Sequence, residues 1–485
     1  YMNWADCAVL FTSASSLSNE GTTLVIKDPQ RQVIHSVSFS PDWFRGSFKE
    51  EGGWSLEMID PSNPCGCSEN WAASKDASGG TPGRANSVYK SNPDDEAPIA
   101  ARAIISDSSL LEVYFTEAMD SASLLSAEDW LTGPFENNLS GMTNPARVVP
   151  ISPDFKTTKL FFNEVFKSGI TYFLRLSGNQ KDCAGNFSDS SGTIRFAIPD
   201  TVSCRDIIIN EILSDPLSGG SRFVELYNRS EKIIDLRSLV LSNSDTLAGL
   251  LPNATPLISN GYLLFPGNYI VITPSPDDIC EKYRSPAPEA IIGMTGFPVF
   301  GDDTGTVILA RKDNLIIIDK VQYGSEMHYP LLTTREGVSL ERTNPEMSSD
   351  DKNNWHSAAE TVGFATPAYQ NSHWVRPGET DDEINIEPDI FSPDNDGRDD
   401  LLNIIIRENN PDCGVNITIY DSRGRLIKQL ANNVLSGNEG FFVWDGMTDN
   451  RGKAPLGFYI LLIEFTRPDG TVRIIKRTTV LAGKL

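Results

Sequence analysis

An acidic turn near the C-terminal end of the chain carries the densest set of groups that could bind a ligand. Asp394, Asp396, Asp399 and Asp400 lie in a stretch that also contains Asn395 and a glycine. Carboxylate and amide oxygens on one tight turn are the hard ligands that Ca²⁺ selects, although this spacing differs from that of an EF-hand. Asp, Asn and Gly also dominate ordinary turns, because they cap backbone groups and accept positive φ. The turn is therefore a candidate structural Ca²⁺ site, with a capped turn as the alternative, and no other cofactor is expected.

Sequence patterns typical of enzymes are absent. The chain has four histidines and contains none of HExxH, GxSxG, GxGxxG or GxxxxGK[ST]. These patterns position a catalytic zinc ion, a nucleophilic serine or the phosphates of a nucleotide. Glu211 and Glu225 remain as a carboxylate pair of the kind that glycosidases place about 5–10 Å apart. A structural role near strand ends is the favoured interpretation for both, and we predict no catalytic residues and no enzymatic activity.

Composition narrows the class of protein further. The 485 residues include 65 acidic and 41 basic side chains, which gives a net charge of −24. This charge opposes binding to nucleic acid or to anionic lipid headgroups. Hydrophobic residues at 39 %, with 30 Pro and 37 Gly, indicate a folded, turn-rich, all-β chain. The apolar runs are strand-sized and far shorter than the roughly 20 residues that cross a bilayer, so we expect no transmembrane segment.

The seven cysteines cannot all pair within the chain, because their number is odd. Cys65-Gly66-Cys67 lacks the spacing and the further ligands of a structural zinc site. Cys183 and Cys204 flank the end of one apparent domain. They are predicted to form a disulfide, which would stabilise the fold by about 2–4 kcal/mol in an oxidising compartment.

Comparison of the chain with itself reveals a duplication. Residues 53–57 (GWSLE) recur as residues 337–341 (GVSLE), an offset of 284. Asn70-Trp71 recurs as Asn354-Trp355 at the same offset. Residues 81–82 and 86–87 recur at 366–367 and 371–372, an offset of 285. A fixed offset between similar segments is typical of duplicated domains. Trp71 and Trp355 are expected to fill the cores of the two copies.

Alternating apolar residues precede each of these repeated segments. They predict a strand pair over residues 22–27 and 33–39 in the first copy, and over 306–310 and 315–323 in the second. The second copy begins earlier, with Ile207–Leu213 and Phe223–Asn228, whereas the first copy has no such beginning. We therefore expect this chain to start inside a domain.

The motifs INEIL-x-DP, FVELYN, GVSLER and NW…TP…NS resemble the lamin-tail domain, an immunoglobulin (Ig)-like β-sandwich found in nuclear lamins and in exported bacterial proteins. The resemblance covers residues 206–372 and, in part, residues 1–90. Between the copies, FTEAMD at residues 115–120 and DCAGN at residues 182–186 resemble a bacterial Ig-like domain of surface-layer proteins.

The C-terminal residues are similar to the Ig-like domains of flagellar hook-capping and gliding-motility proteins. In the latter group, FTPNGDGxND opens a module that serves as a sorting signal for type IX secretion in Bacteroidota. Residues 391–400 read FSPDNDGRDD, with Ser392 and Asp394 in place of Thr and Asn. The resemblance implies an exported, Bacteroidota-like protein.

These observations predict an all-β chain of four tandem Ig-like β-sandwich domains, the first one incomplete. The predicted domains are a partial lamin-tail-like sandwich at 1–90, a bacterial Ig-like domain at 97–199, a complete lamin-tail-like sandwich at 206–372 and a C-terminal Ig-like domain at 384–485. We expect an extracellular or outer-membrane surface location and a non-enzymatic scaffold or envelope-complex subunit, with other envelope or surface proteins as partners and no nucleic acid.

Two further hypotheses belong to other classes. The chain could be the accessory region of a larger secreted hydrolase whose catalytic domain lies upstream. It could also be a glycan-binding adhesin, because Trp4, Trp43, Trp130 and Trp374 lie near turns or linkers and could form a surface that contacts carbohydrate or protein. Local packing is the favoured interpretation for each of these rings taken alone.

Overall fold

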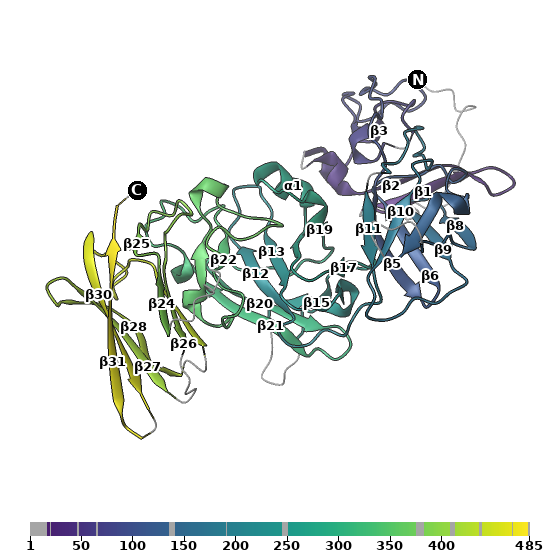
Figure 1. The fold of residues 1–485 in the computed structure, drawn as a ribbon. Coiled ribbons are helices and arrows are strands. Elements are labelled where there is room, and N and C mark those ends of the chain that lie inside the picture. Colours follow the sequence, from purple (N-terminus) through teal and green to yellow (C-terminus); the bar gives the residue numbers. More distant parts are fainter. Residues whose placement is uncertain are drawn as a thin grey trace. The chain divides into compact units, whose positions relative to one another are not determined.

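The computed structural model describes residues 17–19, 21–45, 48–64, 66–134, 141–190, 192–244, 251–374, 383–407, 413–435, 439–467 and 469–483. The chain divides into two compact units, Tyr1–Ile198 and Pro199–Leu485. Strands dominate both units, and the described residues contain one α-helix (Figure 1). This confirms the predicted all-β chain of tandem sandwiches, whereas the four domain boundaries stay predictions. In the described ranges, no helix is both long enough and apolar enough to span a membrane.

The first unit begins with two antiparallel strand pairs. β1 (Thr22–Lys27) pairs with β2 (Val33–Phe39), which confirms both predicted strands at their predicted bounds. β3 (Leu56–Met58) pairs with β4 (Trp71–Ala73). Three short 3₁₀-helices accompany these strands: Pro41–Phe44, Phe48–Glu51 and Ser68–Asn70.

A β-sandwich follows in the same unit. One sheet has the order β5-β6-β9-β8 and the other β11-β10-β7. Their bounds are Ala100–Asp107 (β5), Leu110–Phe115 (β6), Trp130–Gly133 (β7), Arg147–Ile151 (β8), Thr157–Phe161 (β9), Tyr172–Leu176 (β10) and Thr193–Phe196 (β11), with a 3₁₀-helix at Ala127–Asp129. Strands β6 and β9 alternate between fully buried and half-buried residues, as expected for strands with one face on a core.

The second unit opens with the lamin-tail-like region. Its largest sheet has the order β19-β18-β13-β12-β22-β23, and a second sheet has the order β16-β15-β20-β21 (Figure 1). The bounds are Ile207–Leu213 (β12), Phe223–Asn228 (β13), Ile234–Asp235 (β14), Leu239–Ser242 (β15), Thr255–Pro256 (β16), Leu263–Leu264 (β17), Tyr269–Thr273 (β18), Ile291–Gly293 (β19), Thr304–Arg311 (β20), Ile317–Gly324 (β21), Leu340–Arg342 (β22) and Trp355–Ser357 (β23).

Helices in this region are short. The α-helix α1 spans Pro276–Lys282, and 3₁₀-helices span Leu236–Ser238, Pro288–Ala290, Ser325–Met327, Lys352–Asn354 and Glu360–Val362.

Strand β12 is buried along its entire length, which alternation alone does not predict. Ile207, Ile209 and Ile212 pack into the core between the two sheets. A bulge between Ile209 and Glu211 shifts the register with β13. Leu213, beyond the bulge, packs on the opposite face against Ile279 of α1. Both faces of the strand are therefore covered, because α1 closes the side that would otherwise face water.

The C-terminal region is a further sandwich. A three-stranded sheet β24-β26-β29 faces a five-stranded sheet β25-β31-β30-β27-β28 across one apolar core. The bounds are Ile384–Glu387 (β24), Ile390–Phe391 (β25), Leu402–Arg407 (β26), Gly414–Asp421 (β27), Leu426–Leu435 (β28), Glu439–Trp444 (β29), Gly457–Thr466 (β30) and Val472–Leu481 (β31). Trp444 and Phe391 are fully buried at its centre, with ring centroids 5.2 Å apart.

Hydrogen bonds repeat in the two duplicated segments at the offsets found in the sequence. A buried glutamate on β3 or β22 accepts bonds from a threonine hydroxyl and from the amide and hydroxyl of a serine. The residues are Glu57, Thr81 and Ser87 in the first copy and Glu341, Thr366 and Ser372 in the second. The side chain of Asn70 bonds the backbone of Asp60 as that of Asn354 bonds the backbone of Asn344. These bonds explain why the duplicated motifs keep their spacing.

Candidate functional site

The acidic turn follows β25 and is folded around one of its own carboxylates. Ligand oxygens of Asp394, Asp396 and Asp400 lie within 4.8 Å of one another. Asp399 is not part of this group; it adopts a φ of 50°, and its carbonyl accepts a 2.8 Å bond from Ser392 N. The structure therefore brings three of the four predicted ligands together.

Asp400 organises the turn. Its Oδ1 accepts bonds from Asp394 N at 2.9 Å and Asn395 N at 2.6 Å, and its Oδ2 accepts a 2.6 Å bond from Gly397 N. His373 Nε2 lies 3.1 Å from the same Oδ2. Burial alone would raise the pKa of Asp400, but the hydrogen bond and charge of His373 and the backbone donors lower it below its usual value. Donors already surround this carboxylate, as expected for the capped-turn alternative.

His373 supplies the positive charge beside the turn. Burial alone would lower its pKa, but Asp400 and Glu341 outweigh burial through hydrogen bonding and charge, and they raise the pKa to about 9. Its ring is 4.4 Å from that of His356, whose own pKa is lowered to about 4 by burial and by the charge of His373. His373 is therefore charged at neutral pH and joins Glu341 of the lamin-tail region to Asp400 of the C-terminal sandwich.

The same turn is the contact between these two sandwiches of the second unit. Tyr329 Oη donates a 2.7 Å bond to the carbonyl of Pro393, and Asn395 Nδ2 donates a 3.0 Å bond to the carbonyl of Ala358. Glu360 N donates to the carbonyl of Asn395 at 2.9 Å. Asn395 is 3 % exposed, and its Oδ1 accepts no hydrogen bond among the described residues. The turn thus couples the C-terminal sandwich to the lamin-tail region, which the sequence did not predict.

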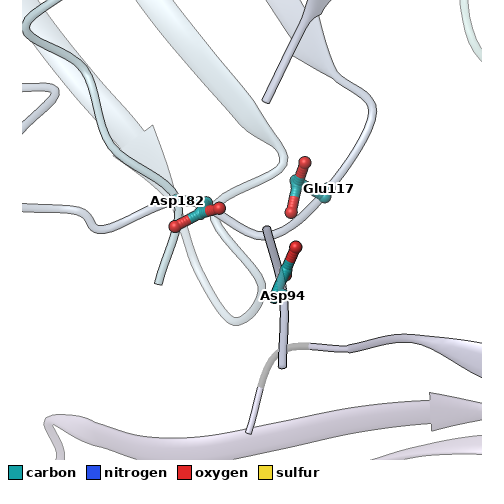
Figure 2. Close-up of side chains that lie close together, drawn as sticks. All are labelled: Asp94, Glu117 and Asp182. Atoms are coloured by element: carbon teal, nitrogen blue, oxygen red, sulfur yellow. The ribbon is translucent and has the colours of Figure 1, made fainter. Parts of the chain in front are cut away.

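A second acidic group lies in the first unit, where the sequence predicted no site. Figure 2 shows the carboxylates of Asp94, Glu117 and Asp182 converging from the linker before β5, the end of β6 and the loop after β10, with ligand oxygens within 4.8 Å of one another. Burial, together with the charges of Asp94 and Asp182, raises the pKa of Glu117 to about 7. The signal was present in the sequence, because Glu117 and Asp182 belong to the FTEAMD and DCAGN motifs.

The bonds of Asp182 give this second group a structural explanation. Its Oδ1 accepts bonds from Gly185 N at 2.6 Å and Asn186 N at 2.8 Å. Asn186 Nδ2 also bonds the carbonyl of Asp94 at 2.9 Å. We interpret the group as a joint between the linker and the DCAGN turn, in which a proton on Glu117 relieves the repulsion between carboxylates.

The candidate catalytic pair has no access to a substrate. Glu211 and Glu225 are both 0 % exposed and face each other across β12 and β13. Glu211 accepts bonds from Ser339 Oγ and Thr366 N, and Glu225 accepts a 2.6 Å bond from Ala368 N. Burial, and secondarily the charge of Glu341, raises the pKa of Glu211 to about 8. These contacts fit the structural interpretation given to the pair.

The predicted pairing of Cys183 with Cys204 is wrong. Cys204 is a free, exposed thiol, whereas Cys183 is disulfide-bonded, so these two cysteines do not pair with each other. Closeness to a domain end in the sequence did not bring their sulfurs together. Cys65, Cys7 and Trp4 lie outside the described residues.

Trp130, a candidate sugar-contacting ring for which local packing was the favoured interpretation, is fully buried. It donates Nε1 to the carbonyl of Leu124 at 3.1 Å and packs edge-on against Phe115, with ring centroids 6.1 Å apart. It therefore belongs to the core and offers no face to a sugar. Trp355 is 3 % exposed, which confirms its predicted place in the core of the second copy, whereas Trp71 in the first copy is only half-buried.

Comparison with protein families defines two of the regions. The Lamin Tail Domain model matches residues 201–325, and the CHU_C Type IX secretion signal domain model matches residues 384–475. Both matches confirm resemblances found in the sequence. The chain thus contains a lamin-tail domain followed by a type IX secretion signal domain, and it is exported. No curated protein matches the chain.

Solved structures show only distant similarity. The N-terminal part of the bacterial S-layer protein SbsC is 15 % identical, with 47 % of this chain and 44 % of that chain covered and a TM-score of 0.19. A DUF4876 family protein from Bacteroides thetaiotaomicron is 12 % identical, with 56 % and 98 % covered and a TM-score of 0.22. Latent PorU from Porphyromonas gingivalis is 12 % identical, with 96 % and 40 % covered and a TM-score of 0.18. The chain spans less than half the length of the S-layer protein fragment that it matches. TM-scores of 0.18 to 0.22 support no conclusion about function.

Proposed function

We propose that this protein is a non-enzymatic scaffold of the bacterial cell surface that works through protein–protein contacts. The observation that carries the proposal is the match of residues 384–475 to a type IX secretion signal domain, C-terminal to the lamin-tail match at residues 201–325. The acidic turn couples the two through Tyr329, Ala358 and His373. A secretion signal domain fixed to a sandwich in this way suits a protein that remains at the envelope as a rigid binding element.

The contacts of the acidic side chains support a role without catalysis. The carboxylates that sequence patterns offered as a catalytic pair, Glu211 and Glu225, are occupied by backbone and hydroxyl donors in the lamin-tail core. Function in a string of sandwiches then resides in exposed loops and strand edges. Other envelope or surface proteins are the partners that such surfaces fit.

A structural Ca²⁺ belongs to the same proposal. Asp394, Asp396 and Asp400 would hold it through hard oxygen ligands. The buried, unpartnered Oδ1 of Asn395 in the same turn supports a further oxygen ligand. The donors that already surround Asp400 limit its share of the coordination, so we assign the ion a stabilising role and no part in chemistry.

Cross-linking on intact cells tests the scaffold. The full chain is produced in a bacterium with type IX secretion, labelled from outside with a membrane-impermeant cross-linker and purified. The scaffold predicts the chain on the surface, cross-linked to envelope proteins. A chain that is released to the medium without cross-linked partners contradicts the proposal.

The second hypothesis is that the chain is an accessory region of a larger secreted hydrolase. The mass of the native gene product separates the two hypotheses, because a hydrolase needs several hundred further residues for a catalytic domain. Hydrolytic activity in that native product, lost when the additional domain is removed, would favour the hydrolase.

A further inference from the structure

Three glutamates form a row across the largest sheet of the lamin-tail region. Glu211 on β12 lies opposite Glu225 on β13 and opposite Glu341 on β22. Side chains of opposite residues in an antiparallel pair lie on the same face of a sheet, so the three carboxyl groups are neighbours. All three residues are 0 % exposed. The face of the sheet that carries the row is therefore closed to water.

The segment of residues 365–373, which we call the strap, covers this row. Each glutamate accepts a hydrogen bond from one backbone amide of the strap. The bonds join Thr366 N to Glu211 Oε1 at 2.9 Å, Ala368 N to Glu225 Oε2 at 2.6 Å and Ser372 N to Glu341 Oε2 at 2.8 Å. Within the described residues, no bond between backbone groups joins the strap to the sheet. The carboxyl groups thus supply the bonds that strand pairing supplies elsewhere in the sheet.

The remaining contacts of the strap do not titrate. Ala365 and Ala368 pack in an apolar cluster beside the sheet. Asn371 Nδ2 donates to the carbonyls of Asn210 at 3.1 Å and Arg342 at 2.8 Å. A change of pH therefore acts on the strap through the glutamate row.

One positive charge faces the three carboxyl groups. His373 Nδ1 lies 3.8 Å from Glu341 Oε2, and no other cation of the described residues lies within 4.0 Å of the row. The guanidinium of Arg342 pairs instead with Asp319, at 3.3 Å. Two further negative charges would be unbalanced at a site without water, so Glu211 and Glu225 retain protons while the strap is closed.

The pKa shifts agree with this balance of charges. Burial, and then the charge of Glu341, raises the pKa of Glu211 to about 8, and burial, and then the charge of Glu211, raises the pKa of Glu225 well above its usual value. The other titratable groups that face the row keep one charge state between about pH 5 and pH 8. They are the phenols of Tyr283 and Tyr369, whose pKa burial raises to about 12, the imidazolium of His373, with a pKa of about 9, and the guanidinium of Arg284.

Opening of the strap would admit water to the row and release these protons. In water the pKa of a glutamate returns to about 4.5, whereas that of Glu211 under the closed strap is about 8. The proton on Glu211 therefore favours the closed strap fully below about pH 4.5, and this contribution is lost as the pH rises to about 8. The strap should open more often at pH 7.5 than at pH 5.5.

The C-terminal end of the strap reaches the joint with the C-terminal sandwich. Ser372 Oγ accepts a 2.9 Å bond from Ala359 N, and the carbonyl of Ala358 accepts from Asn395 of the acidic turn. His373 Nε2 lies 3.1 Å from Asp400 Oδ2. Opening of the strap would remove two of these contacts, those of Ser372 and His373.

We propose that the strap is a proton-held latch, which is closed while Glu211 and Glu225 are protonated and which loosens the joint with the C-terminal sandwich when it opens. The observation that carries this proposal is the row of three buried carboxyl groups, each bonded to the strap, with a single facing cation. The inference does not rest on the proposed surface function, because it concerns the lamin-tail region wherever the protein works.

Hydrogen exchange of the full chain at pH 5.5, 6.5 and 7.5, in excess chelator and corrected for the intrinsic rate at each pH, tests the latch. The amides of Thr366, Ala368 and Ser372 should lose protection at least about tenfold between pH 5.5 and pH 7.5, since one released proton allows up to about tenfold per pH unit. Ala359 should lose protection in parallel. Amides between β12 and β13 should stay better protected than the strap at pH 7.5, because the strap opens before the domain unfolds.

Two variants assign the pH dependence to the row. The double variant Glu211→Gln/Glu225→Gln carries no titrating carboxyl at these positions and should show constant protection of the strap. Glu289→Gln makes the same substitution at an exposed glutamate of the same region and should keep the wild-type fall. The wild-type profile decides by itself if the double variant does not fold.

Three results would overturn the latch. They are constant protection of the wild-type strap between pH 5.5 and pH 7.5, equal protection of the strap and of the β12–β13 pair at pH 7.5, and an unchanged fall in a folded double variant. An Ala359 amide that stays protected while the strap opens would overturn the link to the joint.

Discussion

Replacing Asp400 by alanine should uncouple the acidic turn and destabilise the second unit. Three backbone N–H groups at 2.6–2.9 Å and the His373 ring lose their acceptor, and the site is 3 % exposed, so water replaces it poorly. A buried donor without a partner costs about 1–3 kcal/mol, and breaking a buried ion pair from one side costs about 3–5 kcal/mol. Because these terms overlap at one side chain, we expect a total loss of about 3–5 kcal/mol.

Thermal unfolding at pH 7 in excess chelator is the assay. A loss of this size should lower the transition of the second unit by roughly 6–20 °C. Chelator removes any contribution from a bound cation, so the shift reports only the hydrogen bonds and the ion pair of Asp400. Asp396→Ala is the control, because Asp396 Oδ1 accepts a single 2.9 Å bond, from Arg398 N in its own turn. An Asp400→Ala transition within about 2 °C of the parent would refute the view that Asp400 organises the turn.

Three further predictions concern Trp130, a bound Ca²⁺ ion and Glu211. Trp130→Ala should destabilise the first unit by about 3–5 kcal/mol, measured by chemical denaturation. An unchanged denaturation midpoint would contradict the place of Trp130 in the core. Millimolar Ca²⁺ should raise the melting temperature of the second unit but not of Asp396→Ala, and identical melts with and without chelator would reject the ion. The pKa of Glu211 is raised to about 8, above its unfolded value of 4.5, so the folded state holds a proton that the unfolded state releases. The free energy of unfolding should therefore fall between about pH 5 and pH 8, by at most about 1.4 kcal/mol per pH unit, and Glu211→Gln should flatten this slope; an unchanged slope would contradict the raised pKa.

Local patterns in the sequence were sufficient to predict strands β1 and β2 and to detect the duplication. Alternation placed β1 and β2 at their observed bounds, since successive side chains of a strand point to opposite faces. The offset of 284–285 was informative because side-chain bonds such as Thr81 to Glu57 fix the distance between motifs. Composition and alternation therefore predicted the all-β class.

Local sequence patterns could not predict the contacts between segments that are distant along the chain. The grouping of aspartates on residues 394–400 was visible, but the bonding of Asp400 to His373 depends on how two sandwiches pack. Trp130 lay near a turn in the sequence, yet its indole N–H finds a carbonyl six residues away and its ring enters the core. The pairing of Cys183 likewise depends on tertiary structure, which position along the chain does not encode.

The most direct test of the account compares the full chain with a chain that lacks residues 384–485, both produced in a type IX-secreting bacterium. The fraction of each protein that an external protease cleaves on intact cells is measured. The account predicts that the full chain is cleaved at the surface, whereas the shortened chain is folded but protected inside the cell. Equal cleavage of both chains would contradict it.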